Sequence, residues 1–199
     1  EFASVVSHDL RNPLNVIEGR LELYRDDGDE THLDSVEESV DDMRRLIDDL
    51  LKLARQGKTV GEVEPTDLDA LVTTAWENVE TDEVSLHCDD DLGDVLADAD
   101  RLKQLLENLF RNAVEHGSTA GTVRVGRLSD GFFVADDGPG IPESVADNLF
   151  EYGTTTAEDG TGIGLAIVAE IVEAHGWEIE ASESESGGAR FEITGVEQP

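Results

Sequence analysis

The chain has 199 residues, of which 47 are Asp or Glu and 14 are Lys or Arg, so its formal net charge at pH 7 is −33. This charge repels nucleic-acid phosphates and anionic membranes, which makes both of them poor candidate partners. The length allows one or two small domains with hydrophobic cores, and the single cysteine, Cys88, excludes an internal disulfide.

The excess of acidic residues favours a halophilic protein. An acidic surface suits molar salt, in which the Debye length falls to ~3 Å. Lysine is rare, with only Lys52, Lys58 and Lys103. The alternative interpretation is an ordinary acidic protein.

Residues 1–57 predict two helices joined by a short polar turn. Apolar residues recur at steps of three and four from Leu10 to Tyr24 and again from Leu33 to Ala54. The segment 26–29, which contains Gly28, separates the two runs. One hairpin cannot cover both sides of such an apolar stripe, so we expect two copies to form a dimeric four-helix bundle.

Residues 58–62 are a predicted linker, and the pattern changes in 63–199. Helices are predicted over 67–79, 100–116 and 164–175, and strands over 84–88, 95–97, 122–128, 132–136, 177–182 and 189–194. Thr66 or Asp67 caps the first of these helices, and Gly176 ends the last. The predicted fold class is therefore α+β: a helical hairpin, followed by an α/β sandwich with helices on one face of a mixed sheet.

His8 is the candidate nucleophile. It lies about 200° around the helix from Leu10, away from the apolar stripe, and an exposed imidazole can attack phosphorus. The neighbouring Asp9 could orient or deprotonate the ring. Taken alone, this pair is more typical of a surface histidine beside an acid.

Three further motifs suit a nucleotide. Asn108 and Asn112 lie one helical turn apart, and amide oxygens suit Mg²⁺. Asp136 ends a predicted strand before a glycine-rich turn, so its carboxylate could accept a hydrogen bond from the amine of adenine. The glycine-rich segment 160–164 precedes a helix, whose first amides can bind phosphate. Each motif alone also fits a solvated helix face, an ordinary turn or a flexible loop.

Together and in this order, the motifs resemble the catalytic core of the sensor histidine kinases of two-component systems. Residues 8–14 resemble the H box, 108–112 the N box, 136–141 the G1 box and 160–165 the G2 box, and Phe150 stands at the F box. The resemblance implies a dimerisation and phosphotransfer hairpin over 1–57 and a Bergerat-type ATP-binding domain over 63–199.

The resemblance also implies a role for each matched residue. His8 would be the phosphoacceptor, Asp9 its general base, and Asn12 a residue for dephosphorylating the partner. Asn112 would bind Mg²⁺, with Asn108 supporting the site. Asp136 would recognise adenine, and the residues that shape the pocket and the lid would be Gly138, Gly140, Gly160, Gly162, Gly164 and Leu165.

The implied reaction is ATP-dependent autophosphorylation of a histidine, followed by transfer to an aspartate of a response regulator. The implied cofactors are ATP and Mg²⁺, and the implied partners are a second copy of the chain and a receiver domain. We expect a sensor region to precede the chain, and we expect this segment to be cytoplasmic, because no apolar run approaches the ~20 residues of a membrane span. Membrane attachment of the full-length protein is left open.

Two departures from the family pattern remove positive charge from the site. Glu115 and His116 stand where many relatives carry a basic residue and an aromatic one, and the stretch 150–159 has no cation. The phosphates would then depend on Mg²⁺, on backbone amides and on Arg111 or His116. We hypothesise that concentrated cations in the host cytoplasm replace the fixed lysines.

Two alternatives stay open. An ATP hydrolase of the same superfamily would carry a glutamate four residues before the magnesium asparagine, but Asn108 holds that place and Glu107 points ~100° away. The other alternative is a degenerate kinase that acts as a dimeric binding scaffold, which the two departures modestly favour.

Overall fold

The computed structural model describes residues 2–55, 61–79, 81, 84–89, 91–116, 121–154 and 162–199. The chain divides into two compact units, Glu1–Gly57 and Lys58–Pro199, and each is described by itself. No helix in the described ranges is both long enough and apolar enough to cross a bilayer.

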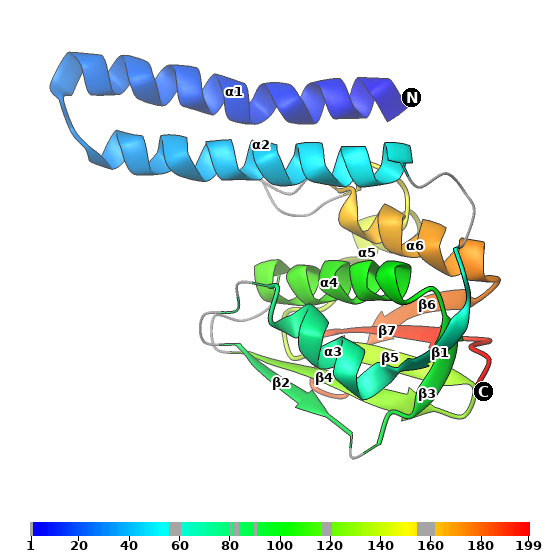
Figure 1. Cartoon of the computed structure of the whole chain (residues 1–199). Helices are drawn as coiled ribbons and strands as arrows, with labels where there is room; N and C mark the ends of the chain where they lie inside the picture. The colour runs from blue at the N-terminus through cyan, green and yellow to red at the C-terminus, as the bar shows by residue number, and fades with distance from the viewer. Residues whose placement is uncertain are drawn as a thin grey trace. The chain divides into compact units, whose positions relative to one another are not determined.

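The first unit is the predicted helical hairpin. Helix α1 spans Phe2–Asp27, and helix α2 spans Thr31–Arg55 and returns antiparallel to it (Figure 1). Gly28 adopts a positive φ of 72° in the turn, which glycine accepts without strain. The amide of Thr31 donates to Oδ1 of Asp29 at 3.0 Å, so this aspartate caps the start of α2.

The hairpin leaves large apolar side chains in contact with solvent. The exposed fractions are 44% for Leu14, 43% for Val16, 47% for Leu23 and 43% for Ile47. Packing of α1 on α2 therefore covers only part of the apolar surface that the two helices carry.

The second unit contains the predicted mixed sheet. Its five strands are β2 (Ser85–Cys88), β4 (Thr122–Leu128), β5 (Gly131–Asp136), β6 (Glu178–Glu183) and β7 (Ala189–Thr194). They lie in the order β2-β4-β5-β7-β6, in which β2 and β4 are parallel and every other pair is antiparallel. The fold class predicted from the sequence is confirmed.

Helices pack on one face of this sheet (Figure 1). Helix α4 (Ala99–His116) contacts β5, α6 (Gly164–His175) contacts β6, and α4 and α6 pack on each other. Helix α3 (Leu68–Trp76) adds to this layer, with the ring of Trp76 edge-on to Phe110 of α4 at 5.2 Å. The short helix α5 (Glu143–Ala146) was not predicted.

The sequence analysis predicted only one of the two strands of a second, small sheet. Strand β1 (Glu64–Asp67) pairs antiparallel with β3 (Asp94–Ala97), with Glu64 opposite Ala97. Asp67 then caps α3, since its Oδ1 accepts the amide of Ala70 at 3.0 Å. The predicted helix over 67–79 ends early because the amides of Asn78 and Val79 bond only three residues back, in a tight final turn.

Candidate functional site

Asp136 lies at the end of β5, where the central strand opens into a glycine-rich turn. Its Oδ1 accepts two backbone amides, from Gly138 at 2.9 Å and from Ala189 at 3.1 Å. Oδ2 has no hydrogen-bond partner among the described residues. Burial raises the pKa of this carboxyl above its ordinary value, while the two amides and the nearby His116 act in the opposite direction. The carboxyl group is thus held firmly by one oxygen.

The turn between β6 and β7 holds the backbone of Asp136. Ser184 Oγ donates to the Asp136 carbonyl oxygen at 2.7 Å and accepts the Gly188 amide at 2.9 Å. A Cβ on Gly188 would lie 2.3 Å from the same carbonyl oxygen, so only glycine fits there. Sequence reasoning missed both residues, because a serine and a glycine in a turn have no distinctive spacing.

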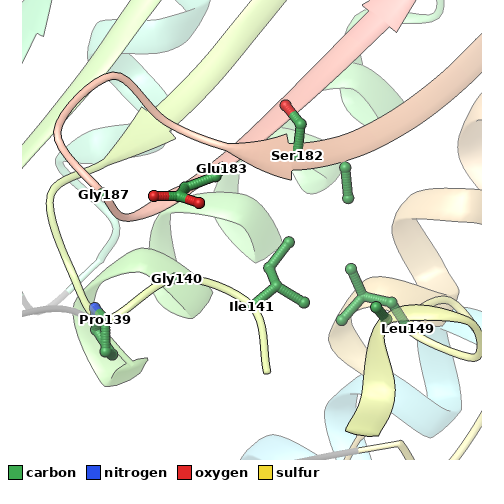
Figure 2. Close-up of a pocket in the computed structure, with 9 residues that line it drawn as sticks. Pro139, Gly140, Ile141, Leu149, Ser182, Glu183 and Gly187 are labelled. Carbon is green, nitrogen blue, oxygen red and sulfur yellow. The ribbon is translucent and has the colours of Figure 1, made fainter. Parts of the chain in front are cut away.

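A pocket of about 310 Å³ opens beside this turn (Figure 2). Ile141 and Leu149 lie on one side of it, and β6 with Ser182 and Glu183 lies on the other. Of the predicted site residues, Gly140 lines this pocket and the carboxyl group of Asp136 does not. Gly140 has a φ of 78°, and a Cβ there would lie 2.9 Å from the Gly187 carbonyl oxygen. The close approach of these two turns explains the glycine.

Asn108 lies on the buried side of α4 and faces the start of α6. Its Nδ2 donates to the Gln104 carbonyl at 3.0 Å, and its Oδ1 accepts from Arg111 at 3.2 Å. The Cβ position of Gly164 is 3.6 Å from the same Oδ1. The structure therefore places Asn108 close to Gly164, with the guanidinium of Arg111 beside them.

Asn112 lies one turn further along α4 and is half-buried. Its side chain has no hydrogen-bond partner in the described part of the chain. No cluster of three or more His, Cys, Asp or Glu side chains suited to a metal occurs among the described residues. The amide oxygen of Asn112 therefore fits a cation that arrives with phosphate and water ligands, as Mg²⁺ does.

Gly153 and Gly162 lie beside each other in the second unit. The Gly153 amide donates to the Gly162 carbonyl at 3.0 Å, and Gly162 has a φ of 62° with no room for a Cβ beside Thr154. Leu165 is half-buried in the first turn of α6. Gly160 lies outside the described residues.

Two aromatic residues, Phe150 and Tyr152, connect the segment after α5 to β7 and α6. Phe150, at the predicted F box, packs edge-on against Phe191 of β7 at 6.5 Å. The Tyr152 hydroxyl donates to Glu170 of α6 at 2.6 Å, and burial together with this bond raises the pKa of the phenol.

The candidate residues of the hairpin lie on α1. Asn12 is exposed. The side chains of His8 and Asp9 lie outside the described part of the chain, so their predicted orientation and roles stay predictions.

Two family models match the chain. "Histidine kinase-, DNA gyrase B-, and HSP90-like ATPase" matches residues 97–197, and "His Kinase A (phospho-acceptor) domain" matches residues 1–59. The first range holds Asn108, Asn112 and Asp136, and the second holds His8.

The sequence is also similar to curated histidine kinases. It is 32% identical over 207 residues to the sensor histidine kinase ZraS of Escherichia coli K12, with 96% of this chain and 44% of that protein covered. It is 31% identical to sporulation kinase A of Bacillus subtilis, with 98% and 34% covered. The chain thus spans less than half the length of these relatives.

Solved structures share the fold. The Acinetobacter baumannii histidine kinase AdeS superposes with a TM-score of 0.71 at 26% identity, over 94% of this chain and 95% of that one. Full-length ShkA in complex with AMPPNP superposes with a TM-score of 0.67 at 28% identity, over 98% of this chain and 46% of that one.

Proposed function

We propose a reaction for this chain, which belongs to the sensor histidine kinases and corresponds to their catalytic core. It uses ATP to phosphorylate His8 and then passes the phosphoryl group to an aspartate of a response-regulator receiver domain. Residues 1–57 would form the dimerisation and phosphotransfer domain, 58–62 the linker and 63–199 the ATP-binding domain. Both family models support this assignment of domains.

The observation that carries the proposal is the way Asp136 is held. Two amides fix Oδ1, and Oδ2 has no partner among the described residues. A fixed carboxylate oxygen can accept a hydrogen bond from the 6-amino group of adenine, whereas guanine carries a carbonyl oxygen at that position and cannot donate from it. The neighbouring Gly138 and Gly140 let the backbone approach a flat base. The nucleotide-bound relative ShkA supports the choice of an ATP-like ligand.

The phosphates would lie between α4 and the start of α6. Asn112 offers an oxygen to Mg²⁺, and the arrangement of Asn108 beside Arg111 places a fixed cation near Gly164. When bound with ATP, Mg²⁺ would neutralise charge on the phosphate oxygens. Arg111 therefore offers one of the positive partners that the sequence lacks at Glu115 and in the lid.

The transfer itself needs mainly positioning. An imidazole nitrogen of His8 attacks the γ-phosphorus, the bond from that phosphorus to the bridging oxygen breaks, and ADP leaves. The attacking nitrogen carries no proton, and Asp9 takes the proton from the other ring nitrogen. Asn12, exposed four residues further on, is the candidate for removing phosphate from the partner.

The exposed apolar side chains of the hairpin support a homodimer. Leu14, Val16, Leu23 and Ile47 need a covering surface, and a second hairpin offers the same chemistry. The cognate receiver domain would dock on this hairpin beside His8.

The position of Glu107 argues against water as the nucleophile. This carboxylate accepts a hydrogen bond from the side-chain Nδ2 of Asn78 at 2.8 Å and lies 3.7 Å from Lys103 Nζ. It is therefore engaged on the side of α4 that faces the end of α3. Apart from the two departures in the sequence, which modestly favour a scaffold, no observation favours a hydrolase or a scaffold over the kinase.

Incubation with γ-labelled ATP and Mg²⁺ tests the proposal. We expect label on the protein that is stable to base and labile to acid, as a phosphohistidine is. His8→Gln should abolish the label and leave the Kd for ATP unchanged, whereas Asp136→Asn should raise the Kd for ATP.

Three results would contradict the proposal in different ways. Label that survives His8→Gln would remove His8 from the reaction. Release of free phosphate alone would indicate a hydrolase. The absence of both labelled protein and free phosphate would indicate a scaffold.

A further inference from the structure

Gly61, inside the predicted linker, is fastened to the nucleotide-binding unit. Its amide donates to Oδ2 of Asp98 at 2.8 Å. A Cβ on Gly61 would also lie 2.8 Å from that oxygen, so a side chain there would push the carboxylate away. The residues that follow form β1, which pairs with β3. The linker therefore becomes part of the second unit at Gly61, earlier than the predicted boundary at residue 63.

Asp98 is itself held at the start of α4. Its Oδ1 accepts the Arg101 amide at 3.2 Å, and Oδ2 lies 3.8 Å from the Arg101 guanidinium. Its own amide donates to Nε2 of His175 at 3.1 Å. The carboxylate that receives Gly61 is thus held by the first turn of α4, and the backbone of the same residue is held by the last residue of α6.

His175 completes the anchor. Since Nε2 accepts a hydrogen bond from Asp98, the ring proton is on Nδ1, which donates to the Ile171 carbonyl at 2.8 Å. The ring stacks on Trp177 with a centroid distance of 4.2 Å. Both ring nitrogens and one ring face are occupied, so the imidazole is locked in place.

The two helices that hold Gly61 also carry the candidate nucleotide site. Helix α4 begins beside Asp98 and bears Asn108 and Asn112, and α6 runs from Gly164 to His175. A movement of the nucleotide relative to the linker must therefore move these helices or break the bond between Gly61 and Asp98.

We propose that Asp98 is a positioning residue for phosphoryl transfer: by fastening Gly61 to α4 and α6 it fixes the point at which the linker leaves the nucleotide-binding unit. This inference rests on the proposed kinase function. A fixed exit point restricts the approaches that the bound γ-phosphate can make to His8, and a restricted approach raises the frequency of productive alignment.

Gly61→Pro tests the anchor without touching the core, because proline lacks the amide proton. It should lower the rate of His8 phosphorylation at saturating ATP by roughly fivefold or more and leave the Kd for ATP within about twofold of the wild type. Val63→Pro is the matched control, since the Val63 amide has no recorded backbone bond in the described ranges. It should retain the wild-type rate.

Asp98→Ala, which removes the acceptor, completes a double-mutant cycle. If the carboxylate acts through Gly61, adding Asp98→Ala to Gly61→Pro should reduce the rate no further than the worse single change. The Gly61 amide proton should exchange slowly in the wild type and fast in Asp98→Ala, as measured by NMR. This readout does not depend on kinase activity.

Equal rates in Gly61→Pro and the wild type would overturn the inference, and so would equal losses in Gly61→Pro and Val63→Pro. A Gly61→Pro variant whose Kd for ATP rises by the same factor as its rate of His8 phosphorylation falls would also overturn it. Asp98 would then support the nucleotide pocket. A wild type that binds ATP without labelling His8 would overturn the proposed function and this inference together.

Discussion

The hairpin and the nucleotide-binding unit bury their apolar residues in different ways. Among the hairpin residues whose side chains the structure describes, Ser39 is the only buried one, while Leu14 and Leu23 are 44% and 47% exposed. The second unit buries a continuous core in which Leu106 and Phe132 have no exposed surface. The second unit therefore has a hydrophobic core of its own, whereas the hairpin leaves large apolar side chains exposed to solvent.

The largest expected effect is on the hairpin. Leu14→Glu with Leu23→Glu should make a dimeric protein monomeric, because two charges would enter the surface that the partner covers. Sedimentation velocity measures the change, and the Kd for ATP should stay constant. Asn15→Glu, at an exposed polar position of α1, is the control. A double variant that remains dimeric would place the dimer contact elsewhere.

A core change should affect only the second unit. Leu106→Ala should lower its free energy of unfolding by about 3 kcal/mol, because a fully buried leucine leaves a cavity. Urea unfolding followed by Trp fluorescence reports on this unit, since Trp76 and Trp177 both lie in it. A loss below about 1 kcal/mol would mean that the core around α4 is loosely packed.

Asp136→Asn should weaken ATP binding without lowering the thermal stability of the second unit. We expect the Kd for ATP to rise about tenfold or more, equivalent to about 1.4 kcal/mol. Burial raises the folded pKa of Asp136, so its stabilising contribution exists in acid and is lost as the pH rises through that value. At neutral pH a neutral Asn should therefore leave the Tm without ATP unchanged or higher. A lower Tm would show that the ionised carboxylate stabilises the fold.

The halophilic interpretation concerns both units, since it follows from the net charge of −33. Between low and molar KCl we expect the Kd for ATP to stay constant or fall, because added cations would screen the acidic surface and the phosphates. Isothermal titration calorimetry measures it, with circular dichroism as the check on folding. A steady rise in Kd with the fold intact would contradict the hypothesis.

The smallest expected effect is at His175. Burial lowers its folded pKa below the ordinary 6.5, so the unfolded chain binds the proton first. Stability should fall as the pH drops from about 6.5 towards the folded pKa, and no further below it. His175→Phe keeps an aromatic ring against Trp177 and should remove this component from the urea midpoint measured against pH. An unchanged profile would show that the imidazole does not contribute.

The sequence predicted those features that depend on local patterns. Steps of three and four gave both hairpin helices and α4, and the cap at Asp67 follows from a short polar side chain before an apolar run. The position of Asp136 at a strand end was also predicted, because the apolar run stops there.

Other features depend on contacts between distant segments and left no local signal. Strand β1 contains Pro65 and only four residues, and it is a strand because β3 lies beside it. Ser184 and Gly188 hold Asp136 from a turn that lies about fifty residues further along. Burial lowers the pKa of His175, and the position of this residue at the end of a helix does not reveal that burial. Spacing alone could not reveal these partners.

The most direct test of the central claim is to locate the phosphate by mass spectrometry. After brief incubation with ATP and Mg²⁺, tryptic digestion at neutral pH should yield a phosphorylated peptide of residues 1–11, which contains Ser4, Ser7 and His8. The account predicts fragment ions that place the phosphoryl group on His8, and its loss after mild acid treatment. Phosphate on a serine, or an unmodified peptide from a protein that has consumed ATP, would contradict it.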